Sequence, residues 1–531
     1  MKKRKNKDKR IEKTLSKHRS YKIFLYNRFF IYLLLIIAQI LAYGLFIALF
    51  VYRSQFAVLL QAFVAVLKFV FVVSIVGGER RMPTKTGWII VILFAPVFGV
   101  PAYLAFGKGR PTRKMRERLE RAREETDEKI RETLGERPPI QPTARAEMIT
   151  AYIEKRAGYP CYTDGEIEYY KNGAELFEQM LTAIGSAEKF VLLEFFIIAQ
   201  GEMWQAVLKS LLQATERGVQ VRIIYDDFGC MMQLPPKYDK YLESLSPHIK
   251  CLPFNKVVPL LALRMNNRDH RKILVVDGKI GFTGGVNIAD EYIGKKRRFG
   301  VWKDTGVKLT GECVNSFTKA FFYLWNAFYK SKENAGAYFV KPTTVSIPQE
   351  KYCIQPYDDC PLDDENVAES VYADVIHRAK RYVYIFTPYL VLNGFLRDAL
   401  CQASLRGVDV RIVTPAVPDK KIVYRLTRAN YGALLNAGVR IFEYTDGFIH
   451  AKSIVSDDEC AVVGTVNFDY RSLYHHFENA VYFTKKSAIE RLKQDCEETF
   501  AVSRERTQEN WKRSAVGKGI DSLLRVLETL L

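Results

Sequence analysis

The feature that most constrains this 531-residue chain is a motif that occurs twice with the same internal spacing. Each copy has the pattern His-x-Lys-x4-Asp-x6-Gly-x2-Asn. The copies consist of His270, Lys272, Asp277, Gly284 and Asn287, and of His450, Lys452, Asp457, Gly464 and Asn467. One short match in a chain with seven histidines can arise by chance, but identical Gly and Asn offsets in two copies argue against chance. We therefore expect a fold built from two similar halves.

The residues around the two motifs repeat as well. Residues 211–225 and 400–414 align without a gap, and each stretch is typical of a helix end, a turn glycine and a β-branched strand. An apolar strand is expected at the start of each repeat, at residues 190–195 and 382–387. Strand, helix and strand in succession predict the α/β class, with a mixed sheet flanked by helices in each half. The two half-domains are expected to pack as a pseudo-dimer.

The motif combines a titratable ring with a fixed cation, the groups needed to attack a phosphodiester and hold its charged oxygens. A nucleophilic histidine needs a second group that protonates the leaving oxygen. Two halves related by a pseudo-twofold axis would place His270 and His450 on opposite sides of one phosphate. The expected donors to the non-bridging oxygens are Lys272, Lys452, Asn287 and Asn467.

A metal site is the main alternative explanation for clustered His and Asp residues. Zinc motifs use His-Glu-x-x-His or Cys-x-x-Cys spacings, and neither occurs in this sequence. A lysine two residues from each histidine would also repel a divalent cation, so no metal and no cofactor are expected. A second alternative, ordinary core strands with an exposed histidine, is weakened by the duplication. Asp277 and Asp457 are assigned to structural support or to histidine orientation, and both roles stay open.

The duplicated motif resembles that of the phospholipase D superfamily, and the whole chain resembles bacterial-type cardiolipin synthases. Residues 88–107 are similar to the family's N-terminal membrane segment, and residues 387–389 and 473–479 are also similar to that family. The resemblance covers most of residues 60–531. It implies that the His, Lys and Asp of both motifs are catalytic. The candidate phosphate-binding residues are Asn287, Asn467, Gly284, Gly464 and Glu478.

The chain departs from the family at the residue that follows each motif glycine. This residue is usually serine in the family, whereas here it is Gly285 in the first copy and Thr465 in the second. The resemblance therefore implies that a hydroxyl contact to phosphate is lost from the first half.

Three apolar segments precede the motifs, at residues 29–52, 56–76 and 88–106. The first has 24 uncharged residues, enough to cross a bilayer core of roughly 30 Å. The second contains Lys68, and the third contains proline and glycine. Buried hairpins of a soluble protein are the alternative, above all for the third segment. We expect N-terminal transmembrane helices, with two spans and a re-entrant or interfacial third segment.

Basic residues flank these segments, and the net charge of the chain is +20. By the positive-inside rule, the N-terminus and the catalytic region are expected on the cytoplasmic face of a bacterial plasma membrane. Nine scattered cysteines without a Cys-x-x-Cys motif fit a reducing compartment. A basic chain also suggests nucleic acid, but here the charge is concentrated beside the apolar segments. The expected partner is anionic membrane lipid rather than nucleic acid.

The predicted domain organisation follows from these patterns. In chain order it is a basic N-terminus (1–28), a membrane region (29–107), a charged linker or helix (108–148), a first phospholipase D-type domain (149–340), a second one (341–515) and an amphipathic C-terminal helix (516–531). The charged segment is expected to be a solvated helix. The C-terminal helix is expected to pack on the core or to lie on the bilayer.

The resemblance implies cardiolipin synthesis. One phosphatidylglycerol gives its phosphatidyl group to a histidine and releases glycerol, and the terminal hydroxyl of a second phosphatidylglycerol attacks the intermediate. We expect His270 to be the nucleophile and His450 the general acid and then base, although the sequence allows the reverse. A phospholipase D hydrolase, another phosphodiesterase or nuclease of the superfamily, and a non-enzymatic membrane scaffold are the alternatives.

Overall fold

The computed structural model describes two compact units of the chain. Described are residues 40–41, 44, 47–48, 54–78, 82–96, 99–100, 103–104, 113–135, 146–256, 267–341, 352–363, 365–511 and 514–527. The first unit comprises Met1–Gly109, Met231–Tyr238 and Thr529–Leu531. The second unit comprises Arg110–Cys230 and Asp239–Glu528, so both motifs lie in it.

The described part of the first unit contains a pair of helices, α2 (Ser54–Gly77) and α3 (Met82–Phe94). Ile75 of α2 and Trp88 of α3 belong to one apolar cluster that also includes Tyr103. The rings of Trp88 and Tyr103 lie 5.5 Å apart in an edge-to-face arrangement, which favours the packing.

The predicted membrane segments fall partly on this unit. Among the described residues, no helix has both the length and the apolar character of a bilayer span. Segment 29–52 lies almost entirely outside the described residues, segment 56–76 lies within α2, and segment 88–106 begins in α3. The N-terminal transmembrane helices are not confirmed by the structure and stay a prediction.

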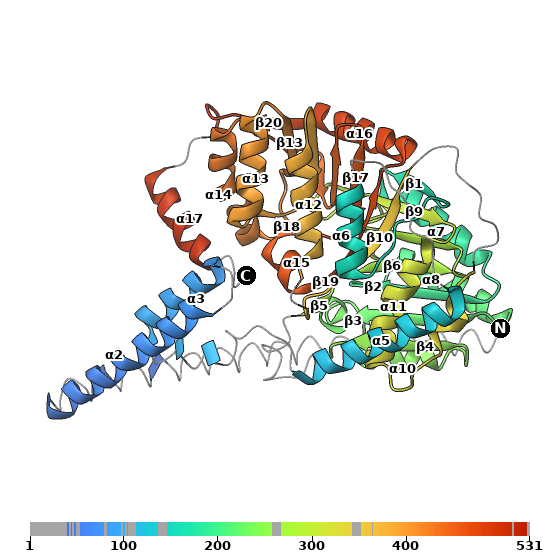
Figure 1. Cartoon of the computed structure of the whole chain (residues 1–531), viewed down its shortest axis with the longest axis horizontal. Helices are drawn as coiled ribbons and strands as arrows, with labels where there is room; N and C mark the ends of the chain where they lie inside the picture. The colour runs from blue at the N-terminus through green and yellow to red at the C-terminus, as the bar shows by residue number, and fades with distance from the viewer. Residues whose placement is uncertain are drawn as a thin grey trace. The chain divides into compact units, whose positions relative to one another are not determined.

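Two mixed sheets form the core of the second unit (Figure 1). Within the described residues, the strand order of the first sheet is β1 (Glu166–Tyr170), β9 (Gly306–Thr310), β7 (Ile280–Gly284), β6 (Lys272–Val276), β2 (Phe190–Phe195), β3 (Gln220–Asp226) and β4 (Ile249–Phe254). The order of the second is β10 (Ile354–Asp359), β19 (His476–Phe483), β17 (Cys460–Gly464), β16 (Ser453–Ser456), β11 (Tyr382–Phe386), β13 (Asp409–Pro415), β14 (Arg440–Tyr444) and β20 (Ser503–Arg506).

The two sheets have the same topology. Strands β2, β3 and β4 are parallel to one another, as are β11, β13 and β14, and the strands on the other side of each sheet pair antiparallel. The predicted α/β fold with a duplicated half-domain and mixed sheets is therefore confirmed. β20 has no counterpart in the first sheet.

Helices of the two halves also correspond. These are α7 (Gly173–Gly185) and α12 (Val367–Arg378), α8 (Glu202–Glu216) and α13 (Gly394–Leu405), and α11 (Val314–Phe328) and α16 (Lys486–Ala501). The side chain of Asn172 accepts from the backbone N–H of Glu175 at the start of α7, at 2.9 Å. Asn393 caps α13 in the same way through Leu396. Such caps satisfy backbone donors that a helix leaves unpaired at its first turn.

The charged helix α5 (Arg113–Leu134) is not solvated all round, which corrects our expectation. Leu119, Ala122 and Thr126 are buried, and the helix packs against α11. Spacings of three and four residues place these side chains on one face, so the remaining faces carry the charges. Arg123 donates to Asp363 at 3.0 Å, which ties the helix to the second half.

Two further helices pack on the second half. Helix α6 (Glu147–Ala157) precedes β1 in the chain, yet it lies against α12 and β10 (Figure 1). The C-terminal helix α17 (Ala515–Leu527) packs on α14 (Lys421–Asn436), where Arg425 donates to Asp521 at 2.9 Å. Of the two positions expected for the C-terminal helix, the structure shows packing on the core.

A buried ionic network centred on Arg271, within the first motif, joins the two halves. Arg271 is fully buried and donates to Glu194 of β2 at 2.7 Å and to Asp358 of β10 at 3.3 Å. It also contacts Asp269 at 3.4 Å and the Ala320 carbonyl at 3.1 Å. One guanidinium thus compensates carboxylates from both halves in a buried environment.

Arg271→Ala is expected to lower the free energy of unfolding by about 3–5 kcal/mol, because buried carboxylates would lose their cation. Denaturant unfolding followed by fluorescence measures this loss. The matched control is Arg397→Ala, since Arg397 pairs with Asp398 at 3.2 Å on the surface. The control should lose no more than about 1 kcal/mol. Equal losses in the two variants would contradict a special role for the buried network.

Candidate active site

The first motif histidine is held by the second half-domain. It follows the short strand β5 (Arg268–Asp269), which pairs with the beginning of β19. The backbone N–H of His270 donates to the Phe477 carbonyl at 2.9 Å. Its ring Nδ1 lies 2.9 and 3.0 Å from the two carboxylate oxygens of Glu478, which is fully buried. With Nδ1–H as donor to this carboxylate, Nε2 keeps a lone pair for attack.

The second motif histidine is held by the first half-domain in the same manner. Strand β15 (Gly447–Ile449) pairs in parallel with β8 (Val301–Lys303). The backbone N–H of His450 donates to the Lys303 carbonyl at 2.7 Å, and its Nδ1 lies 2.7 Å from Oδ2 of buried Asp304. Each histidine is therefore oriented by a carboxylate of the opposite half.

Asp304 was not among the residues proposed from the sequence, whereas Glu478 was. Strand register shows that the two are equivalent, because each lies two residues before the residue paired with its motif glycine, Gly284 or Gly464. The signal in the sequence is an acidic residue downstream of each motif, Asp304 just before β9 and Glu478 within β19. The intervening segments differ in length, so alignment of the repeats does not bring the two carboxylates together.

The motif lysines are buried beside the histidines. Lys272 Nζ donates to the His270 carbonyl at 2.5 Å, and Lys452 Nζ donates to the His450 carbonyl. Burial lowers the pKa of Lys272 to about 8. Burial also lowers the pKa of Lys452 to about 7, and the charge of Lys272 acts in the same direction. The two motifs therefore share one electrostatic environment.

Burial and the adjacent lysines also act on the histidines. Burial and then the charge of Lys272 hold the pKa of His270 well below its usual value. Burial and then Lys452 lower the pKa of His450 to about 4, although the Asp304 carboxylate opposes this shift. Both rings are consequently neutral near neutral pH before a substrate enters. A neutral imidazole is the form that a nucleophile requires.

Asp277 and Asp457 lie at the far end of the motif strands from the histidines. Each carboxylate accepts three backbone N–H bonds at 2.8–2.9 Å, and each residue has a positive φ. The donor residues lie at the start of β2 and β11 or just before it. They are Glu188, Lys189, Phe190, Lys380, Arg381 and Tyr382. Of the two roles left open by the sequence, these contacts favour structural support.

The motif glycines allow close approach of neighbouring strands. A Cβ at Gly284 would lie 2.3 Å from the Thr305 carbonyl oxygen, and one at Gly464 would lie 2.4 Å from that of Asn479. A Cβ at Gly285 would lie 2.0 Å from Oδ1 of Asp304. A side chain at position 285 would therefore displace the carboxylate that orients the second histidine, which gives the departure from the family a physical reason.

The hydroxyl of the equivalent residue in the second half is engaged with the other orienting carboxylate. Thr465 donates to the Glu478 carboxylate, and Ser472 donates to the same group. Two hydroxyl donors and the His270 ring thus surround one buried carboxylate. Burial raises the pKa of Glu478, and these hydrogen bonds oppose that shift.

The motif asparagines follow β7 and β17. The Asn287 amide donates to the Tyr292 hydroxyl at 2.7 Å, and its oxygen accepts from the Ile197 N–H at 3.1 Å. Asn467 is buried, and its side-chain oxygen has no hydrogen-bond partner within the described part of the chain. Donation by these amides to a phosphate stays a prediction.

One group of potential metal ligands occurs among the described residues. Side-chain atoms of His270, His476 and Glu478 lie within 4.8 Å of one another. However, His270 Nδ1 is already bound to Glu478, and burial, followed by nearby cations that include Lys272, lowers the pKa of both histidines. A cation at this position would face the same repulsion, so the absence of a metal stays our prediction.

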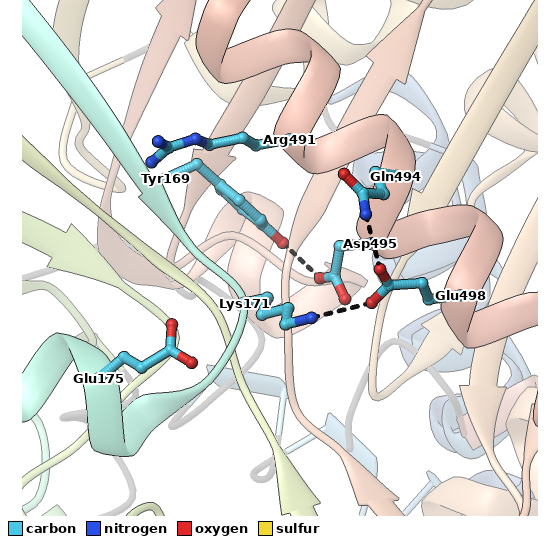
Figure 2. A pocket seen from close by; sticks show the side chains of 7 residues that line it. All are labelled: Tyr169, Lys171, Glu175, Arg491, Gln494, Asp495 and Glu498. Carbon is cyan, nitrogen blue, oxygen red and sulfur yellow. Dashed lines mark hydrogen bonds and ion pairs between the residues drawn. The ribbon is translucent and has the colours of Figure 1, made fainter.

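Figure 2 shows a pocket of about 210 Å³ at the seam between β1 and α16. Its lining residues are Tyr169, Lys171, Glu175, Arg491, Gln494, Asp495 and Glu498, and none belongs to a motif. Asp495 accepts from Lys303 Nζ at 2.6 Å. Because successive strand residues face opposite sides, Lys303 points to Asp495 while Asp304 points to the histidine. The polar groups at this seam therefore anchor β8.

Comparison with known proteins adds to this geometry. The family described as "Cardiolipin synthase, PLD-like domain" matches residues 180–325 and 372–500. A cardiolipin synthase of Staphylococcus aureus is 32% identical over 486 residues, which cover 88% of this chain and 95% of the relative. This chain belongs to the cardiolipin synthase family, within the phospholipase D superfamily.

Other similarities agree with membership of this family. The family described as "Phospholipase D-nuclease N-terminal" matches residues 66–108. An uncharacterized protein of Streptococcus mutans is 40% identical over 467 residues, covering 87% of this chain and 99% of that protein. The crystal structure of a phosphatidylserine synthase from Haemophilus influenzae covers 72% of this chain and 100% of its own, with a TM-score of 0.55 and 15% identity. The last comparison concerns the fold alone.

Asp304→Asn is expected to reduce kcat for cardiolipin formation by about 10²–10⁴, because His450 would lose the carboxylate that orients it for proton transfer. Asp277→Asn should instead lower the unfolding temperature and leave kcat per folded molecule nearly unchanged. The measurements are steady-state kinetics and thermal unfolding of both variants, with exposed Asp398→Asn as the control. An equal loss of kcat in both would contradict the supporting role of Asp277.

Binding of a phosphodiester anion should weaken as the pH rises from 6 to 9. Lysine is cationic only below its pKa, so Lys452 (about 7) and Lys272 (about 8) lose charge within this window. For each lysine that must be charged, the affinity falls by up to about tenfold per pH unit above the pKa of that lysine. Calorimetry with dimethyl phosphate, whose charge is constant there, measures the affinity. In Lys452→Met, the fall in dimethyl phosphate affinity near pH 7 should disappear. An affinity of the unmodified chain that does not change with pH would contradict the expectation.

Proposed function

We propose that this chain makes cardiolipin and glycerol from two molecules of phosphatidylglycerol through a phosphohistidine on His270. Membership of the cardiolipin synthase family makes the chain a phosphatidyltransferase that acts on phospholipid. The observation that carries the proposed mechanism is the pair of buried motif histidines, each bound through Nδ1 to a carboxylate of the opposite half. This arrangement provides a nucleophile and an acid–base group in one site.

In the first step, Nε2 of His270 attacks phosphorus and the bond from phosphorus to the glycerol oxygen breaks. Lys272 and Lys452 stabilise the charge that grows on the non-bridging oxygens. The leaving oxygen takes its proton from His450. Because an anionic phosphate favours the charged form of neighbouring bases, substrate binding raises the pKa of His450, which takes up this proton from solvent.

In the second step, the terminal hydroxyl of another phosphatidylglycerol attacks phosphorus. The bond from phosphorus to Nε2 of His270 breaks, and the hydroxyl proton passes to His450. The products are cardiolipin, a free His270 ring and a protonated His450, the state of the substrate complex. His450 returns its proton to solvent when the anionic product leaves, so the cycle consumes no cofactor.

The charges around the two rings support His270 as the nucleophile. Burial, and then the charges of Lys272 and Lys452, lower the pKa of His270. Burial and Lys452 also lower the pKa of His450, to about 4, but there the Asp304 carboxylate favours the protonated form. The ring whose carboxylate favours protonation suits proton transfer, and the other suits nucleophilic attack.

For the setting of the reaction, we propose a multi-pass protein of the bacterial plasma membrane with its catalytic halves on the cytoplasmic face. The support is the apolar segments at residues 29–52 and 56–76 and the basic residues around them. Residues 66–108 also match the N-terminal family model. The coarser statement, a membrane-associated bacterial protein, follows from the family.

Labelled phosphatidylglycerol vesicles with the full-length protein, without nucleotide or metal, test the activity. We expect cardiolipin and an equal amount of released glycerol. Phosphatidic acid as the main product would instead support the alternative of a hydrolase, in which water takes the second step. No product from any phosphatidyl donor would contradict the proposed function.

A phosphatidyl ester of p-nitrophenol tests the assignment of the two histidines, because its leaving group needs no proton. His450→Ala should still release one p-nitrophenolate per molecule and retain the labelled phosphatidyl group. His270→Ala should release none, and both variants should fall below about a hundredth of normal cardiolipin synthesis. Exposed His377→Ala is the control. A burst from His270→Ala and none from His450→Ala would reverse the assignment.

A further inference from the structure

The surroundings of the two motif histidines differ in spite of the duplicated fold. His270 has Phe196 at 5.0 Å and the imidazole of His476 at 5.3 Å between ring centres. His450 is instead surrounded by aromatic rings at 5.6–5.9 Å. These rings belong to Tyr292, Trp302 and Phe448.

Strand pairing between the halves builds this aromatic group. Trp302 of β8 is the register partner of Phe448 in β15, two residues before His450. The Trp302 and Phe448 ring centres lie 4.8 Å apart, and those of Trp302 and Tyr292 lie 5.3 Å apart. The group is therefore contributed by both halves and is fixed by the same β8–β15 pairing that holds the histidine.

The indole of Trp302 has an unused hydrogen-bond donor. Its Nε1 is buried and has no hydrogen-bond partner among the described residues. Buried polar groups in native proteins are nearly always hydrogen-bonded, so an unpaired donor beside a reactive group calls for an acceptor from a ligand. The centre of the indole ring lies 5.9 Å from the centre of the His450 ring, so this donor is close to the proposed acid–base group.

We propose that Trp302, with Tyr292 and Phe448, forms the subsite for the polyol part of the alcohol, and that its indole N–H donates to the hydroxyl next to the reacting one. The inference rests on the proposed function, which requires an alcohol beside His450 in both steps. Glycerol leaves through this subsite in the first step, and the glycerol headgroup of the acceptor lipid occupies it in the second.

This subsite accounts for transfer rather than hydrolysis. The alcohol oxygen forms the new bond to phosphorus, the bond to His270 Nε2 breaks, and the alcohol proton goes to His450. Aromatic faces cover the carbon chain of a bound polyol and exclude water, while the indole N–H selects an alcohol with a second hydroxyl. A simple alcohol, which fills the subsite without a second hydroxyl, leaves that buried donor unpaired.

Exchange of free alcohols into labelled phosphatidylglycerol tests the proposal in the full-length protein. Glycerol exchange re-forms phosphatidylglycerol, and propan-1-ol gives phosphatidylpropanol. Trp302→Phe keeps an aromatic ring and removes the N–H. We expect kcat/KM for glycerol to fall about three- to tenfold, the usual size of one hydrogen bond. The value for propan-1-ol, which lacks the second hydroxyl, should stay the same.

The matched control is Trp511→Phe, since Trp511 packs against Tyr431 and Arg428 in the second half and lies near neither motif in the sequence. It should change neither value. Equal losses for both alcohols in Trp302→Phe, or no loss for either, would overturn the proposal. Failure of the unmodified chain to transfer to any alcohol would instead overturn the proposed function.

Discussion

The hydrogen bond between each motif histidine and a buried carboxylate of the opposite half is the interaction on which the site depends. His270 is oriented by Glu478 and His450 by Asp304. Because the partner always comes from the other half, neither half-domain alone contains a complete site. The strand pairs β5–β19 and β8–β15 hold these hydrogen bonds in place, since His270 directly follows β5 and His450 directly follows β15.

Burial determines the charges of this site. Without substrate, the pKa values of both histidines and both lysines are lowered, first of all because burial excludes water. Nearby cations lower the pKa of the two histidines and of Lys452 further. An anionic phosphate is the ligand that relieves this repulsion. In the proposed reaction, phosphate binding and protonation of His450 are thereby coupled, since both follow from one electrostatic change.

Duplication provides a nearly symmetric frame, whereas the proposed reaction needs two unequal histidines. Local departures from the repeat supply the inequality. Gly285 leaves room for Asp304, and Thr465 donates its hydroxyl to Glu478. His476 places a second imidazole 5.3 Å from the first histidine, while aromatic rings of Trp302, Tyr292 and Phe448 surround the second. The same backbone thus carries the proposed nucleophile on one side and the proposed alcohol subsite on the other.

The sequence by itself determined the duplicated motif, the α/β half-domains and the family, because these follow from spacing and hydrophobic periodicity along the chain. It also identified Glu478, through a resemblance rather than a contact. Only the tertiary structure decided that Asp304 is the equivalent carboxylate, that Asp277 binds backbone N–H groups, and that one face of α5 is buried. These facts arise from contacts between segments far apart in the sequence, and local patterns do not encode which distant atoms meet.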